Sequence, residues 1–201
     1  MQGRSFAAVE GMGEWFGKIY FFQGPVYHRY SIGNPDGMDI HYPRALSAWC
    51  DPPLPREFHS GVDAVLNGKG KWAGHAYFFK GNRYARYSWS DDAYEFTNPL
   101  STWNNLPRDF QGGIDAAING MFQYSNYAYF FKGGRYARYD WVNDVCDYSG
   151  PISAWNLPAD FLQNLDAAVN APANYVGSGK YLGKAWFFKG RQYVRYVWPN
   201  N

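Results

Sequence analysis

The chain has 201 residues, enough for one domain, and 46% of them are hydrophobic, so a sizeable core can be buried. Aromatic residues make up 21%, and the net charge of +2 argues against a nucleic-acid-binding protein. No apolar run approaches the roughly 18 residues needed to cross a bilayer, and residues 1–14 do not resemble a signal peptide. We therefore expect a cytoplasmic or non-classically released protein without a membrane span.

The first of four repeated units is expected over about residues 4–45. Phe6–Ala8 is typical of a short inner strand, and an aromatic hairpin follows around the glycine turn after Phe21–Gln23. Asp39–Tyr42 is expected to form the outer strand. A linker that contains a tryptophan and a Leu-Pro pair then leads to the next unit.

The second unit is expected over about residues 60–100 and repeats the pattern more clearly. Asp63–Leu66 is the predicted inner strand, and Ala76–Phe79 pairs with Tyr84–Trp89 in the hairpin. Ala93–Phe96 supplies the outer strand. A period of two in the apolar residues favours strands over helices throughout this segment.

The third and fourth units are expected over about residues 112–150 and 163–201. The third has its predicted outer strand at Val145–Tyr148. The fourth carries a short insertion near residues 174–183, and too few residues follow Trp198 for a strand of usual length. We therefore predict that the fourth unit lacks its outer strand.

An arginine recurs in the third strand of every unit, within the pattern Tyr-x-Arg-Tyr. Because it occurs at all four equivalent positions, we interpret it as part of the scaffold, lying along neighbouring aromatic rings. The four residues are Arg29, Arg86, Arg138 and Arg195.

Four such units predict one domain over residues 1–201, an all-β, four-bladed β-propeller with a central channel. The Asp-Ala strand, the Phe-Phe-Lys-Gly hairpin, the Tyr-x-Arg-Tyr strand and the Trp…Leu-Pro linker together resemble the hemopexin repeat. The resemblance extends over nearly the whole chain and implies a hemopexin-like propeller of the stand-alone, signal-less type found in plants, fungi and bacteria. Cys50 and Cys146 do not match the ring-closing disulfide of secreted members, so we expect free thiols.

The resemblance also implies a structural calcium or sodium ion in the channel, held by backbone carbonyls of the inner strands. The first ring of carbonyls would come from Phe6, Asp63, Asp115 and Asp166. The second ring would come from Ala8, Val65, Ala117 and Ala168. The alternative is that the three aspartates only bond the adjacent linker.

The loop between the first two strands carries an aromatic ring in every unit. These residues are Trp15, Trp72, Tyr124 and Tyr175. With Lys18, Lys71 and His75 nearby, they suit a flat or polyhydroxylated anionic ligand such as haem or a sugar. The alternative, suggested by the recurrence itself, is that the rings pack between blades as scaffold.

No nucleophile elbow, zinc-helix motif or phosphate loop occurs, so we do not expect an enzyme. The predicted function is binding of haem or another small planar or cationic ligand, with defence as one setting. The alternatives are a carbohydrate-binding lectin and a storage or protein-interaction module. The open edge at Tyr193–Trp198 further predicts a homodimer through blade 4, or a monomer whose edge is covered by residues 1–5.

Overall fold

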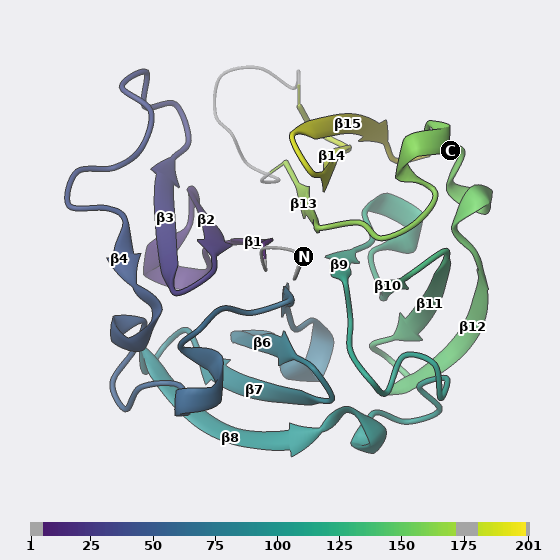
Figure 1. The fold of residues 1–201 in the computed structure, drawn as a ribbon, viewed down its shortest axis with the longest axis horizontal. Coiled ribbons are helices and arrows are strands. Elements are labelled where there is room, and N and C mark those ends of the chain that lie inside the picture. Colours follow the sequence, from purple (N-terminus) through teal and green to yellow (C-terminus); the bar gives the residue numbers. More distant parts are fainter. Residues whose placement is uncertain (1–5, 172–180, 200–201) are drawn as a thin grey trace.

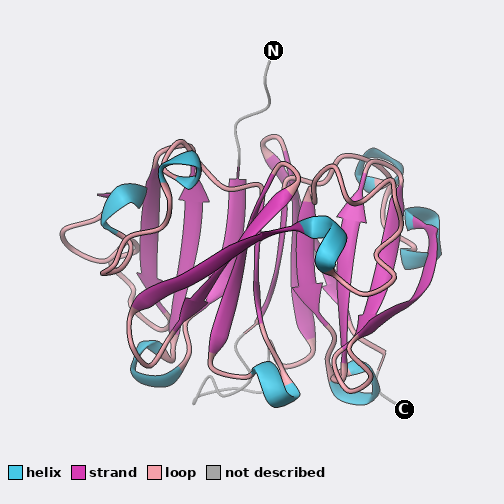
Figure 2. Cartoon of the chain, turned by 90° about the horizontal axis from the view of Figure 1, so that it is seen from below, coloured by secondary structure: helices cyan, strands magenta, loops and turns pink. Residues whose placement is uncertain are grey.

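Short strands rich in aromatic residues fold into four antiparallel sheets, which surround a central channel in the computed structural model (Figure 1). The structure describes residues 6–171 and 181–199. The fold is an all-β, four-bladed propeller, as the repeats predict. Seen from the side, the strands run along the channel axis and short helices lie at both ends of the ring (Figure 2). No helix in the described ranges is long and apolar enough to span a membrane.

Each sheet is one blade, and its strands follow the chain order outward from the channel. Blade 1 comprises β1 (Phe6–Glu10), β2 (Lys18–Gln23), β3 (Val26–Ser31) and β4 (Arg44–Ala45). Blade 2 comprises β5 (Ala64–Asn67), β6 (His75–Lys80), β7 (Arg83–Ser88) and β8 (Ala93–Pro99). Blade 3 comprises β9 (Ala116–Asn119), β10 (Tyr127–Lys132), β11 (Arg135–Asp140) and β12 (Val145–Pro151). Blade 4 shows three strands within the described ranges: β13 (Ala167–Asn170), β14 (Lys184–Lys189) and β15 (Gln192–Val197).

Short 3-10 helices connect these strands. Three follow the inner strands of blades 1 to 3: η1 (Gly13–Trp15), η4 (Gly70–Trp72) and η6 (Phe122–Tyr124). The others lie in the linkers between blades: η2 (Leu46–Ala48), η3 (Arg56–Phe58), η5 (Leu100–Thr102), η7 (Ile152–Trp155) and η8 (Ala159–Phe161).

The outer strand of blade 1 differs from the expectation at Asp39–Tyr42, which was wrong. On the outer edge of β3, Tyr30 forms an isolated bridge with Met38. Regular pairing with β3 begins again only at β4. The carboxylate of Asp39 instead accepts hydrogen bonds from Arg29 Nε at 2.6 Å and from the Ser31 amide at 2.9 Å. Pro43, which has no N–H to donate, stands just before β4. The segment therefore bends away from the ladder.

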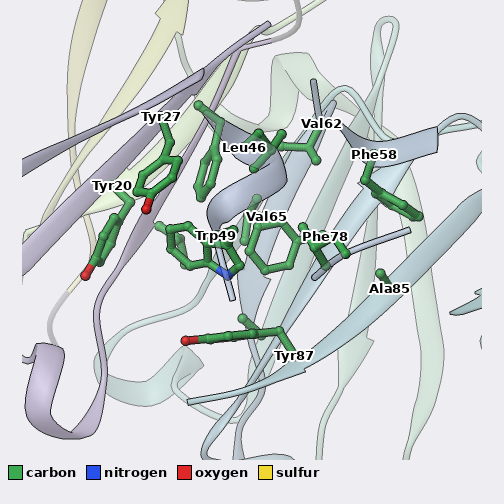
Figure 3. Packing of buried hydrophobic residues seen from close by; sticks show 14 of the residues in the cluster. Tyr20, Tyr27, Leu46, Trp49, Phe58, Val62, Val65, Phe78, Ala85 and Tyr87 are labelled. Carbon is green, nitrogen blue, oxygen red and sulfur yellow. The ribbon is translucent and has the colours of Figure 1, made fainter. Parts of the chain in front are cut away.

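The hydrophobic core of the described residues lies between blades, at the junctions of blades 1 and 2, of blades 2 and 3, and of blades 3 and 4. At the junction of blades 1 and 2, the linker residue Trp49 inserts between the two sheets (Figure 3). Its ring centroid lies 4.9 Å from that of Tyr20 and 5.4 Å from that of Phe78. Trp103 and Trp155 occupy the same place at the next two junctions. Edge-to-face aromatic packing thus holds neighbouring blades together.

Candidate functional site

The aspartates at the positions predicted to supply the first ring of backbone carbonyls use their side chains to hold the hairpin turns. Each carboxylate accepts a hydrogen bond from a turn glycine amide, at 2.5 to 2.8 Å. The three pairs are Asp63 with Gly81, Asp115 with Gly133, and Asp166 with Gly190. In blade 1, the ring of Phe6 packs against Phe21 and Phe188 instead. The side chains of this set thus serve the hairpin turns and the packing of neighbouring blades.

The last residues of the inner strands form a ring of side-chain amides, a feature that the sequence analysis did not identify. Asn67 Nδ2 donates to the carbonyl of Glu10 in the preceding blade at 2.8 Å. In the same way, Asn119 donates to Asn67 O at 2.7 Å and Asn170 donates to Asn119 O at 2.8 Å. All three side chains are buried. Each blade from the second onward is thereby bonded to the one before it; we call this set the amide ring.

Every asparagine of the amide ring also accepts a hydrogen bond from an indole of its own blade. The donors are Trp89, Trp141 and Trp198, each with Nε1 at 2.8 Å from the amide oxygen. The asparagine and tryptophan thus satisfy each other in a buried setting, where an unpaired polar group is costly.

The amide ring also reveals the direction of the inner-strand carbonyls. In blade 2, the Gly68 amide donates to His75 O at 2.9 Å. In this antiparallel register, the backbone groups of Leu66 and Ala64 therefore also point toward β6. The carbonyl of Asn67 points the other way, toward the next blade. Because backbone direction repeats every second residue, the carbonyls of Val65 and its counterparts Ala8, Ala117 and Ala168 also point away from the second strand of their blade.

Glu10 holds the fourth position of the amide ring and breaks its pattern. A carboxylate cannot donate as an amide does, and Glu10 Oε1 instead accepts from the Asn170 backbone amide at 3.1 Å. Burial raises the pKa of Glu10 above its usual value of 4.5, although the nearby Lys69 opposes that shift. A carboxyl group with an elevated pKa thus lies where the other blades carry a neutral amide.

Lys69 lies beside Glu10 and spans two blades. Its Nζ donates to the carbonyls of Gly120 and Ser125, both at 3.0 Å. Burial lowers the pKa of this ammonium group, and the charge of Glu10 partly offsets the effect. The two residues place one acidic and one basic group at the same end of the channel.

A cavity of about 300 Å³ opens at this end, where the inner strands finish; we call it the mouth. Its polar wall is the amide ring with Glu10 and Lys69, and its apolar wall comes from the loops that follow the inner strands. The residues that bear on binding are Glu10, Lys69, Met12, Phe16 and Met121. Flexible methionines and a ring around a few convergent polar groups are typical of a small-molecule site.

The aromatic residues predicted for the rim take part in packing. Trp15, Trp72 and Tyr124 are half-buried and pack against three different core clusters. None of them lines the mouth, although the loops that carry them do. Tyr175 lies outside the described residues.

The predicted rim cations also have partners within the propeller. Lys18 Nζ donates to Ser31 Oγ at 2.5 Å, and Lys71 lies 3.1 Å from the carboxylate of Asp144. His75 lies beside the Trp72 carbonyl at 3.2 Å. Lys71 also lies over the Trp72 ring, at 5.1 Å from its centroid. The structure therefore brings three of the predicted residues, Lys71, Trp72 and His75, together in blade 2, and the other described members of the set lie in other blades.

Comparisons with known proteins agree with this architecture. No protein-family model matches the chain. Matrix metallopeptidase-21 of Danio rerio is 27% identical over 123 residues, which are 60% of this chain and 20% of that protein. The chain therefore matches only a fifth of the length of this curated relative.

Solved structures match over nearly the whole chain. Hemopexin fold protein CP4 from cow pea has a TM-score of 0.74 and 22% identity, covering 96% of this chain and 86% of that one. A plant lectin with two metal binding sites from Cicer arietinum has a TM-score of 0.73 and 20% identity, with the same coverage. Together with the ring of four antiparallel sheets, these likenesses show that the chain has the hemopexin-like four-bladed propeller fold.

Proposed function

We propose that the protein is a non-enzymatic binding protein whose central channel takes cations: a metal ion along its axis, and the cationic group of a small ligand at the mouth. The observation that carries the proposal is Glu10. Three of four equivalent positions hold an amide that completes a hydrogen-bonded ring, and the fourth holds a carboxyl group that is costly to bury. Such a departure from the local pattern is typical of a functional position.

The metal ion of this proposal would be calcium or sodium. Hard cations prefer oxygen ligands, and the stacked carbonyls of the inner strands supply them without any charged side chain. The described residues hold no cluster of three or more acidic, histidine or cysteine side chains that would form another kind of metal site. The Cicer arietinum lectin, described as having two metal binding sites, supports this part of the proposal by analogy of fold.

Thermal melting tests the metal ion. Calcium at millimolar concentration should raise the melting temperature of chelator-treated protein, because an ion that binds only the folded state stabilises it. Sodium in place of calcium identifies the preferred ion. Identical melting curves in chelator, calcium and sodium would contradict a channel ion.

Calorimetric titration with spermidine tests the mouth. The wild-type protein should bind it, and Glu10→Gln should weaken binding at least tenfold, because the amide removes the charge and keeps the size. Glu14→Gln, which neutralises an exposed carboxylate on η1, is the matched control and should bind as the wild type does. Equal affinities for all three proteins, or no binding at all, would overturn the mouth as a cation site.

Haem, the planar ligand implied by the resemblance, remains part of the proposal. A titration followed at the Soret band measures it directly. A shifted, saturable band would add haem to the ligand class, and an unchanged spectrum would remove it.

Lectin activity is the second candidate, and the structural match to a plant lectin favours it. Four similar blades would also offer repeated low-affinity sites, which together raise avidity. A glycan array combined with cell agglutination tests it. Agglutination that a free sugar inhibits supports the lectin, whereas an empty array with no agglutination excludes it.

Self-association through blade 4 is proposed as well. β15 is the last strand of its sheet in the described ranges, and Tyr193 and Val197 on it are 67% and 59% exposed. An open, apolar strand edge is a template for a second copy. Light scattering should give twice the 23.0 kDa chain mass, and Val197→Lys should restore the monomer. A monomeric mass for the wild type at all concentrations would rule out the dimer.

A further inference from the structure

The space between neighbouring blades is unequal around the ring. Clefts open on the junction of blades 1 and 2 and on that of blades 2 and 3, with volumes of about 350 and 280 Å³. The corresponding cleft between blades 4 and 1 measures about 690 Å³. Three positions of the repeat line all three clefts: Tyr20, Tyr27 and Trp89; Tyr77, Tyr84 and Trp141; and Trp186, Tyr193 and Ile32.

Tryptophan rings fill the smaller clefts. At the junction of blades 2 and 3, Trp141 packs against Tyr77 and the linker residue Trp103 packs against both. At the junction of blades 4 and 1, the Trp141 position is held by Ile32, and none of the described residues there is a linker tryptophan. Among the residues that the structure describes, an isoleucine in place of an indole leaves more open space at this junction.

The walls of the cleft between blades 4 and 1 are aromatic and aliphatic. Trp186 takes the place of Tyr77, and its ring lies 6.0 Å from that of Tyr181. Tyr193 borders the same space, and Ile19 and Ile32 form the opposite wall. A half-buried indole and two tyrosines facing aliphatic side chains suit a flat apolar body.

A guanidinium group that has no carboxylate partner among the described residues lines this cleft. In the first three blades, the repeated arginine is paired with an acid near or on the outer strand. The pairs are Arg29 with Asp39, Arg86 with Glu95, and Arg138 with Asp147, at 2.5 to 2.9 Å. Arg195 lines the cleft at the equivalent place in blade 4, and no acid pairs with it in the described ranges.

We infer that the cleft between blades 4 and 1 is a binding site for a flat aromatic anion, whose rings pack on Trp186 and whose acidic group pairs with Arg195. The volume lies within the range of small-molecule sites, and one charged group among apolar walls fixes the orientation of such a ligand. A charge-assisted bond to guanidinium is about twice as strong as a neutral one. This site borders the mouth at Ala171, which lines both cavities, and the two sites would select ligand groups of opposite charge.

The fluorescent probe 8-anilinonaphthalene-1-sulfonate has this chemistry and serves as the test ligand. Folded wild-type protein should bind one molecule, with a blue-shifted and saturable emission. Arg195→Gln should weaken binding about tenfold, and Arg191→Gln, at an exposed position in the adjacent turn, should leave it unchanged. The uncharged N-phenyl-1-naphthylamine should bind the wild type and Arg195→Gln equally, which isolates the charge.

Ile32→Trp provides the second test, because it restores the residue found at the other junctions. The variant should lose probe binding and melt no lower than the wild type. Glu10→Gln should bind the probe normally, which separates this site from the channel. The inference is overturned if the wild type does not bind the probe, as when another part of the chain fills the cleft. Unchanged binding by both Arg195→Gln and a folded Ile32→Trp would overturn it as well.

Discussion

The junction of blades 2 and 3 and the junction of blades 4 and 1 are built from the same repeat but have opposite interiors. The first encloses Trp103 and Trp141, both less than 10% exposed, within a continuous aromatic core. The second has Ile32 at the equivalent of Trp141 and leaves a cleft of about 690 Å³. The three inner strands of each blade pair in the same order in both places. Whether a propeller junction is a core or a binding cleft is therefore decided by one or two large side chains.

Removing a ring from each junction gives the largest expected effect. Trp103→Ala should lower the free energy of unfolding by about 3–5 kcal/mol, since it empties a packed core. Trp186→Ala should cost only about 1–2 kcal/mol, because that ring already borders open space. Urea unfolding of both variants measures the difference. Equal losses would show that the cleft is packed in solution.

The amide ring gives a smaller effect. Asn119→Ala removes the partner of Trp141 Nε1 and the donor to Asn67 O, both buried, so stability should fall by about 3 kcal/mol. Asn104→Ala is the control: its amide donates to the Asp144 carbonyl from an exposed position and should cost less than about 1 kcal/mol. Urea titration compares the two, and equal costs would contradict the role of burial.

Glu10→Gln should stabilise the protein by about 1 kcal/mol at pH 7, or a rise of roughly 2–4 °C in melting temperature. Burial raises the pKa of Glu10, so its protonated form favours folding; that contribution is present at low pH and lost as pH rises through the folded pKa. The advantage of the variant should therefore shrink toward pH 5. Melting curves at both pH values measure it, and a constant difference would contradict the buried charge.

The smallest effect concerns the two thiols, which lie in the filled junctions. Cys50 and Cys146 are free and buried, and burial raises the pKa of each to about 12. Because the thiolate is the reactive form, native protein at pH 8 should react with a disulfide reagent only slowly. Two thiols should titrate after denaturation without a reductant, and Trp103→Ala should expose Cys146 faster. Rapid reaction of the native wild type would contradict the packing.

The four repeated units made the propeller fold predictable from the sequence. The prediction was less accurate where one unit departs from the others. The aromatic hairpins recur with little change, so their strands lie where expected. The sequence predicts the outer strand of blade 1 at Asp39–Tyr42, but in the structure the Asp39 side chain bonds Arg29. A sequence does not show which partner a side chain selects. Tertiary hydrogen bonds overrode the strand propensity there.

The candidate sites were less predictable, because they depend on which residues of different blades meet. The rings at Trp15 and Trp72 suggested a ligand surface, yet they pack within the scaffold, which their recurrence had also suggested. A usable signal was present: asparagine ends three inner strands and tryptophan follows three Tyr-x-Arg-Tyr segments. Glu10 is the exception to the asparagine pattern and lies at the mouth. Ile32 is the exception to the tryptophan pattern and lies in the cleft between blades 4 and 1.

The direction of the amide ring has a consequence for how the protein is made. Each asparagine donates to a carbonyl of the blade that precedes it in the chain, never to one that follows. During synthesis the N-terminal part of a chain emerges first, at about 5–20 residues per second. Every blade therefore finds its acceptor already made, and the growing propeller can be assembled blade by blade on the ribosome. The bond from the Asn170 backbone amide to Glu10, which joins the last blade to the first, closes the ring.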